Sequence, residues 1–129
     1  MIYLASPHND PSYQVKYLRY IQVVEYTAWL LDLGLLVVSP IAHSKIIAGF
    51  RLDDASSFAG WRDLDLHWIT ICSSFGVLML DGWKSSDGVR QELAHAEKCH
   101  KPIFKFKWEW LRDPEIDVLS ILSKAGATK

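Results

Sequence analysis

The sequence lacks paired cysteines, an excess of charge of one sign and any long apolar run. Its two cysteines, Cys72 and Cys99, form no CxxC pair and have no neighbouring histidine at a spacing typical of zinc sites. We therefore expect structural thiols and neither a metal nor another cofactor. With 14 basic and 15 acidic residues the formal net charge is -1, and the basic residues form no cluster. The sequence thus excludes polymeric nucleic acid as an expected partner.

Segments typical of membrane or secreted proteins are missing as well. The longest apolar stretches, such as residues 35–38 and 77–80, have the length of strands, whereas a membrane helix needs about 20 apolar residues. The first residues, MIYLASP, lack the basic region and the apolar core of a secretory signal. These features predict a cytoplasmic protein without a membrane partner.

The sequence does contain enough apolar side chains for one compact core. Hydrophobic residues make up 50% of it, and its 129 residues suit one domain, 1–129, with a frayed tail at 125–129. Apolar spacing and breaker residues divide the chain into alternating elements. Strands are expected at residues 2–5, 35–39, 75–80 and 102–106, and helices at residues 13–33, 58–72, 88–99 and 114–124.

The alternation of strands and helices predicts a parallel sheet, because parallel neighbours need crossover helices. We expect an α/β fold with a doubly wound parallel sheet, a flavodoxin-like or Rossmann-like three-layer sandwich of about four to five strands. Residues 40–57 are predicted to form a loop, and a further strand is placed either in that loop or at residues 108–111.

Three loops at the carboxyl ends of the strands are expected to form a ligand site, because open parallel sheets bind ligands there. They span residues 6–10, 40–44 and 81–88. In the third loop, Ser86 stands where a helix N-cap belongs, Gly88 permits close approach to the backbone, and the helix N-terminus suits an anion such as phosphate. Glu92 follows one turn later. The alternative is that Ser85 or Ser86 only caps the helix and that Glu92 is solvated.

Three segments together form a family-like pattern. Residues 2–7 read IYLASP, residues 65–69 read DLHWI, and residues 86–96 read SDGVRQELAHA, which fits S-x-G-x-x-x-E-[LI]-x-x-A. In this order they resemble the nucleoside 2-deoxyribosyltransferases and the related deoxynucleoside 5'-monophosphate N-glycosidases. The resemblance covers residues 2–106 and implies a nucleoside or nucleotide as the small-molecule substrate and a homodimer or higher homo-oligomer.

For the active site, the resemblance implies a two-carboxylate reaction at the N-glycosidic bond. Glu92 would attack C1' of the sugar and form a covalent glycosyl-enzyme intermediate, and Asp65 would contact the substrate and assist departure of the base. Ser86 would bind the 5'-phosphate of a nucleotide, and Tyr3 and Ser6 would border the sugar. The expected enzyme is an N-glycosidase or a deoxyribosyltransferase.

Two further residues are candidates for binding the base. His43 belongs to a predicted loop at a strand end, where a histidine can bind a base or transfer a proton, and Trp83 lies in the third loop, where it can cover a base or sugar. The alternative for each is a structural or exposed side chain. Asp63 competes with Asp65 because both lie near the start of one predicted helix, and the spacing to Trp68 favours Asp65.

Two departures from the family leave the substrate open. The phosphate-binding members have a glycine-rich loop after the first strand, where this chain has SPHNDP at residues 6–11, and Asp87 places a negative charge beside the proposed anion site. We favour a nucleoside monophosphate over a free nucleoside. A module that sequesters a nucleotide without turnover is the alternative function. A flavin-type electron carrier is disfavoured, because the first loop lacks the closely spaced set of serines and threonines and the glycine that flavodoxins use for the flavin phosphate.

Overall fold

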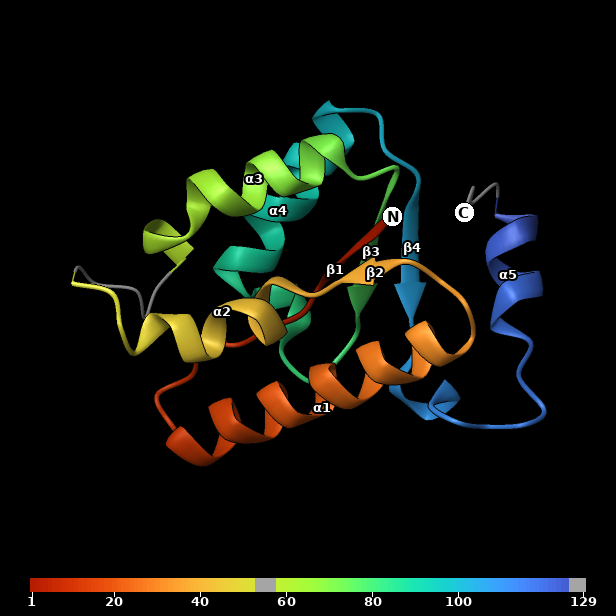
Figure 1. Ribbon diagram of the computed structural model, residues 1–129, viewed down its shortest axis with the longest axis horizontal. Helices are drawn as coiled ribbons and strands as arrows, with labels where there is room; N and C mark the ends of the chain where they lie inside the picture. Colours follow the sequence, from red (N-terminus) through yellow and green to blue (C-terminus); the bar gives the residue numbers. More distant parts are fainter. Residues whose placement is uncertain (53–57, 126–129) are drawn as a thin grey trace.

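The computed structural model describes residues 1–52 and 58–125, and the predicted frayed tail lies outside them from residue 126 onward. In these ranges the chain forms four strands and five α-helices (Figure 1). The strands are β1 (Ile2–Ala5), β2 (Val37–Val38), β3 (Ser74–Leu78) and β4 (Ile103–Phe106). The helices are α1 (Tyr13–Asp32), α2 (Pro40–Ala48), α3 (Arg62–Ile71), α4 (Asp87–Lys98) and α5 (Val118–Lys124). None of these helices is both long enough and apolar enough to cross a membrane.

The sheet has the strand order β2-β1-β3-β4, and each neighbouring pair is parallel. Helices α1 and α5 contribute to the apolar cluster on one face of the sheet, whereas α3 and α4 contribute to the cluster on the other. The prediction of an α/β fold with a doubly wound parallel sheet is therefore confirmed. The strand order reverses between β1 and β3, which is the place where open α/β sheets bind their ligands.

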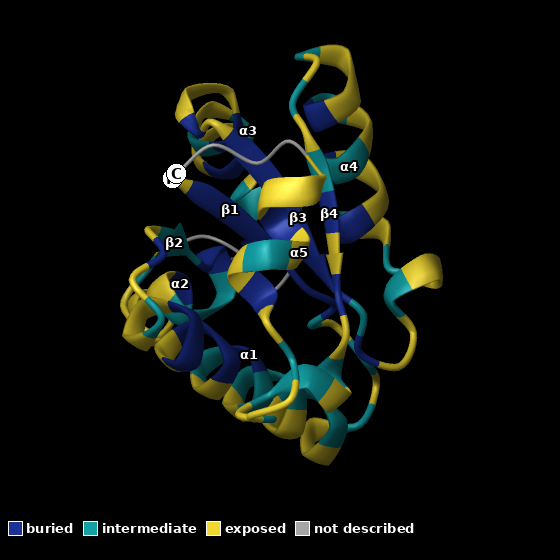
Figure 2. Cartoon of the chain, turned by 90° about the vertical axis from the view of Figure 1, so that its right-hand side faces the viewer, coloured by how far each residue is buried: buried dark blue, intermediate teal, exposed yellow. Residues whose placement is uncertain are grey.

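Strand β1 divides its side chains between the two faces, as the two-residue period of a strand requires. Ile2 and Leu4 pack into the cluster with α1 and α5, whereas Tyr3 and Ala5 pack into the cluster with α3 and α4. Figure 2 shows the central strands β1 and β3 as buried, with most exposed residues on the helices and loops around the sheet. Tyr3 is thereby directed toward the helix that carries Glu92.

Gly76 in the middle of β3 is required by packing across the sheet. A Cβ atom at this position would lie 2.5 Å from the ring of Phe106 and 3.4 Å from the side chain of Ile2. Since Phe106 is fully buried, its ring has no free space into which it can move. The small residue therefore lets the aromatic side chain of Phe106 pack closely against β3.

The structure corrects the prediction of a loop at residues 40–57, because residues 40–48 form helix α2. The side chain of Ser39 accepts a hydrogen bond from the backbone N–H of Ala42 at 3.1 Å and caps the helix. Pro40 occupies the start of the helix, where its fixed φ is compatible with helical geometry and its missing N–H is not needed. The predicted loop residues 53–57 lie outside the described residues.

Two smaller differences concern the C-terminal third. The alternative strand at residues 108–111 is wrong, because Trp108–Trp110 form a short 3-10 helix. Helix α5 begins at Val118 instead of residue 114, because Asp117 accepts a hydrogen bond from the backbone N–H of Ser120 at 3.0 Å and so caps the helix at that point.

Candidate active site

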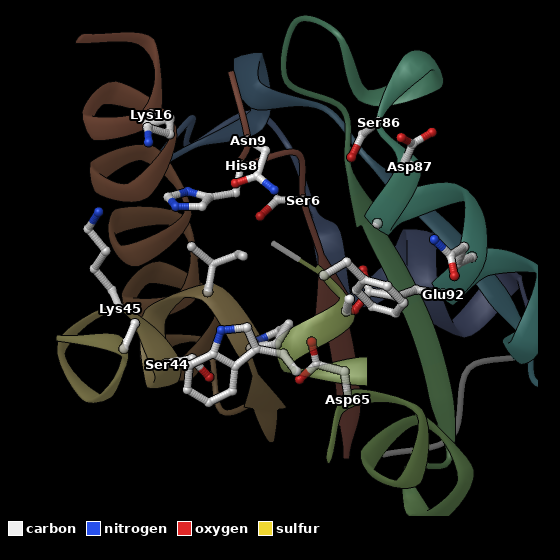
Figure 3. A pocket seen from close by; sticks show the side chains of 18 of the residues that line it. Ser6, His8, Asn9, Lys16, Ser44, Lys45, Asp65, Ser86, Asp87 and Glu92 are labelled. Carbon is white, nitrogen blue, oxygen red and sulfur yellow. The ribbon is translucent and has the colours of Figure 1, made fainter. Parts of the chain in front are cut away.

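A cavity of about 810 Å³ lies at the switch point between β1 and β3. Its volume is within the range of about 300–1,000 Å³ that is usual for small-molecule sites. The lining comes from the loop after β1, from α1 to α4 and from the 3-10 helix Phe58–Gly60 (Figure 3). Of the predicted site residues, those that line it are Ser6, Asp65, Ser86, Gly88 and Glu92.

Glu92 is held at the base of the cavity by Tyr3. The phenol of Tyr3 donates a hydrogen bond to Oε2 of Glu92. The Tyr3 ring is fixed in turn by stacking on Phe75 of β3, with 5.7 Å between ring centroids. Burial and the neighbouring Glu92 raise the pKa of Tyr3 well above its usual value, so the phenol stays protonated and remains a donor at neutral pH. The structure therefore places Tyr3 beneath Glu92, where it contacts the carboxyl group and does not line the cavity.

Burial also controls the protonation of Glu92. Only 5% of this residue is exposed. Desolvation raises the pKa of Glu92, the hydrogen bond from Tyr3 lowers it and the nearby Asp65 raises it, and together these effects bring it to about 8. The glutamate is thus poised to exchange its proton near neutral pH, which is the range in which enzymatic carboxyl groups act as acids, bases or nucleophiles.

Asp65 presents a second buried carboxyl group to the same cavity. The first turn of α3 places it there, while Asp63 on the same turn points outward and is exposed. Burial raises the pKa of Asp65 to about 7. Its Oδ1 atom is buried and has no hydrogen-bond partner among the described residues. The contrast between the two aspartates agrees with the choice of Asp65 over Asp63 as the site residue.

Unpartnered polar atoms gather around this cavity. In the described part of the chain, four buried side-chain oxygen or nitrogen atoms have no hydrogen-bond partner: those of Ser6, His8, Asp65 and Ser74. The first three of these residues line the cavity. Since buried polar atoms in proteins are nearly always hydrogen-bonded, their concentration at one cavity indicates a polar ligand.

The N-terminus of α4 forms another part of the lining. The side chain of Ser86 accepts a hydrogen bond from the backbone N–H of Val89 at 3.3 Å, so Ser86 is the helix cap. A Cβ atom at Gly88 would meet only Phe58, at 3.6 Å, which is an ordinary contact. The chain's own packing therefore does not require glycine at this position. The carboxylate of Asp87 forms an ion pair with Arg90 on the outer surface.

The structure brings neither His43 nor Trp83 into the lining. His43 lies on α2, not in a loop, and is exposed, and its ring meets the edge of Trp68 with 4.9 Å between centroids. Trp83 packs against the apolar cluster on the α3 and α4 face, with the ammonium groups of Lys84 and Lys105 near its ring. Both residues follow a strand closely in the sequence, but the side chain of neither one points into the cavity.

Arg19 ties together the two loops that flank the switch point. Its guanidinium donates to the backbone carbonyl of Asn9 at 2.9 Å and to that of Asp81 at 2.8 Å. Gly82 makes room for this contact, because a Cβ atom there would lie 2.6 Å from the guanidinium and its φ of +87° also favours glycine. The loop after β1 is thus fixed relative to the loop that leads into α4.

Sequence reasoning expected residues 40–44 at the ligand site, and Ser44 does line the cavity, although it lies on α2 and not in a loop. It missed Lys16 on α1 and Lys45 on α2, which also line the cavity. The helix signal that would have found α2 is the pair Ser39-Pro40, a good N-cap followed by a residue favoured at the first helical position. Lys16 carried no signal of its own, because a lone lysine on a predicted amphipathic helix is normally a solvated residue.

The cavity lies in the part of the chain that matches a known family of protein domains. A model of a domain of unknown function, DUF1937, matches residues 1–108. The chain belongs to this family. All described residues that line the cavity fall within the DUF1937 match, whereas α5 lies outside it. No curated protein matches the chain in sequence.

The raised pKa of Glu92 should make the free energy of unfolding depend on pH. Between the ordinary value of 4.5 and the raised value of about 8, the folded protein binds a proton at Glu92 that the unfolded chain has released. Stability is therefore lost as the pH rises through this window. Glu92→Gln, which retains an acceptor for Tyr3, should match the wild type near pH 5 and exceed it near pH 9 by several kcal/mol in free energy of unfolding, at about 1.4 kcal/mol per pKa unit.

Urea unfolding at a series of pH values measures this difference. Glu97→Gln is the matched control, because Glu97 lies on the same helix and is exposed. The control should show no such growth with pH. A difference between Glu92→Gln and the wild type that stays constant from pH 5 to pH 9 would contradict the assignment.

Proposed function

We propose that this protein cleaves or exchanges the N-glycosidic bond of a nucleoside or nucleoside 5'-monophosphate, with Glu92 as the nucleophile. The observation that carries the proposal is the pair of buried carboxyl groups, Glu92 and Asp65, in one cavity at the switch point. The resemblance to the nucleoside 2-deoxyribosyltransferases gives these two positions the roles of nucleophile and helper. Such substrates are intracellular metabolites, which fits a cytoplasmic protein.

The reaction uses the singly protonated pair with its proton on Asp65, which is the less populated of the two singly protonated forms because Glu92 has the higher pKa. The Glu92 carboxylate attacks C1' of the sugar as the bond between C1' and the base nitrogen breaks, and the bonding electrons leave with the base. Asp65 supplies the proton that the departing base takes up. The hydrogen bond from Tyr3 orients the attacking carboxylate. Positive charge that develops on the sugar is stabilised by the carboxylate, and the low exposure of the site strengthens this interaction.

The second half of the reaction releases the sugar from Glu92. A water molecule, or a second base in a transferase, attacks C1' and breaks the ester bond, while Asp65 takes up the proton of the attacking group. Two displacements at the same carbon return the original configuration. The identity of the attacking group separates a hydrolase from a transferase.

We also propose that the protein forms a homodimer or higher homo-oligomer. The first half of α1 exposes large apolar side chains at helical spacing: Tyr13 (67% exposed), Tyr17 (52%) and Ile21 (40%). A contiguous apolar stripe on a surface helix indicates a contact with another molecule. A second copy of the chain would cover this stripe.

Base release tests the chemistry directly. Chromatographic detection of free base, after incubation with ribo- and deoxyribonucleosides and their 5'-monophosphates, should show release by the wild type. Glu92→Gln should lower the rate by at least about 1,000-fold, because no covalent intermediate forms, whereas Glu97→Gln should retain it. A panel with and without an acceptor base distinguishes transfer from hydrolysis. No release from any substrate would favour a nucleotide-binding module without turnover.

The pH dependence of the rate reports the two carboxyl groups. With pKa values of about 8 for Glu92 and about 7 for Asp65, the pair carries two protons at low pH, when no nucleophile is present, and none at high pH, when no acid is present. A bell-shaped profile of kcat/KM with its maximum between these values is expected.

Asp65→Asn should change this profile in a specific way. The rate should fall by about 100-fold or more as the acid is lost, the alkaline limb should disappear, and the remaining acidic limb should follow the titration of Glu92 alone. Asp63→Asn is the matched control, since Asp63 is exposed on the same helix. An unchanged profile in Asp65→Asn would exclude the role of Asp65 in proton transfer.

Self-association is tested by sedimentation of the wild type and of Tyr17→Glu. The charged side chain should dissociate the oligomer to monomers, because burial of an unpaired carboxylate is strongly unfavourable. Leu31→Glu is the control, since Leu31 is equally apolar and exposed near the other end of α1. A monomeric wild type at all accessible concentrations would refute the oligomer.

A further inference from the structure

The cavity has two sides of opposite charge. Asp65 and Glu92 project from α3 and α4, whereas Lys16 and Lys45 extend from α1 and α2 on the opposite side (Figure 3). Both lysines are half-buried, so their charges lie close to the cavity and are less screened than charges on the open surface. A ligand that spans the cavity therefore meets cations at one end and carboxyl groups at the other.

The two lysines have no carboxylate partner within 4 Å in the described part of the chain. Asp10, which belongs to the nearby loop, accepts a hydrogen bond from the backbone N–H of Ser12 at 2.8 Å and does not line the cavity. Arg19 differs from the lysines, because its guanidinium is bound to backbone carbonyl groups. Lys16 and Lys45 are thus the cations that remain available to a ligand on this side.

His8 lies on the same side of the cavity, and the nearby positive charges affect its pKa. Burial, together with the smaller effects of Lys45, Lys16 and Arg19, lowers the pKa of His8 to about 4. The imidazole is therefore neutral at physiological pH, and its buried Nδ1 atom has no hydrogen-bond partner among the described residues. Ser6, which is 5% exposed, adds a buried hydroxyl that also lacks a partner. Two cations and two unpartnered neutral polar groups therefore converge on this part of the cavity.

The N-terminus of α4 is a poorer place for an anion than this side. Its capping oxygen on Ser86 already accepts the N–H of Val89, and Asp87 adds a negative charge in the first turn. A phosphoryl dianion is stabilised by ammonium groups and hydroxyl donors and is destabilised by a nearby carboxylate. A phosphoryl group is therefore more stable beside Lys16 and Lys45 than at the N-terminus of α4.

We propose that Lys16 and Lys45, together with Ser6 and His8, form a subsite for the phosphoryl group of a nucleotide. This inference rests on the proposed function, which it deepens by making the substrate a phosphorylated nucleoside and by assigning its phosphate to α1 and α2. A phosphate held there and a sugar carbon at Glu92 lie at opposite sides of the cavity. The nucleoside then bridges them, and a free nucleoside lacks the group that these lysines bind.

Binding is measured in the Glu92→Gln background, so that turnover does not interfere. Calorimetric titration with nucleoside 5'-monophosphates, the matching nucleosides and inorganic phosphate and pyrophosphate should show that the phosphorylated ligands bind more tightly. The double change Lys16→Gln and Lys45→Gln should weaken nucleotide binding by at least about tenfold and reduce its dependence on salt, and should leave nucleoside binding unchanged. Lys45→Arg keeps the charge and should retain most of the affinity.

Controls separate a local effect from a loss of folding. Lys98→Gln removes an exposed lysine at the far end of α4 and should have no effect. Ser86→Ala tests the competing location and should weaken nucleotide binding less than the lysine changes do. Urea unfolding establishes that each variant is folded, and the single lysine variants replace the double variant if it is not.

The results also distinguish this inference from the proposed function. Lysine-dependent nucleotide binding without base release by the wild type would support the subsite and refute the glycosidic chemistry. Base release whose KM for nucleotides is unchanged by the lysine variants would support the chemistry and overturn the subsite. Absence of binding by every phosphorylated ligand, or affinities equal in wild-type and lysine-variant proteins, would overturn it as well.

Discussion

The burial of Glu92 and Asp65 in one cavity, with no described cation that lowers the pKa of either, is the constraint on which the rest of this site depends. Each carboxyl group is removed from water, and Asp65 also makes ionisation of Glu92 less favourable. The hydrogen bond from Tyr3 offsets only part of this effect for Glu92. Such an arrangement weakens the folded protein at alkaline pH, so its presence is understandable when the same groups are needed for chemistry.

The fold supplies the rigidity that this arrangement needs. Tyr3 belongs to a central strand, is fully buried and stacks on Phe75 of the neighbouring strand, so the donor to Glu92 has little freedom to move. Glu92 itself lies one turn and a half into α4, which Ser86 caps. Arg19 fixes the loops on both sides of the switch point. The donor and the carboxyl group therefore come from different elements whose relative position is determined by the packed sheet.

The parts of this structure that follow from sequence are those with strong local signals. Alternation of apolar strands with amphipathic helices predicted the parallel sheet, and the serine cap of α4 placed Ser86, Gly88 and Glu92 at the cavity. Helix α2 was missed because its mixed composition hides the periodicity, although Ser39 and Pro40 mark its start. The direction of His43 was not predictable, since it depends on how α2 packs beside α3. Lys16 and Lys45 were not predicted as site residues for the same reason, because their position at the cavity depends on how α1 and α2 pack.

The opposite charges of the two cavity sides provide a physical basis for substrate orientation. A phosphoryl group is attracted to Lys16 and Lys45 and repelled by ionised Glu92, so both interactions turn it toward α1 and α2. The sugar carbon, which gains positive charge as the base departs, experiences the reverse preference and is stabilised beside Glu92. One separation of charge would thus serve binding and catalysis together, because the ends of the substrate differ in the same sense as the sides of the cavity. Its effect is strongest where burial limits screening, and both carboxyl groups are almost fully buried.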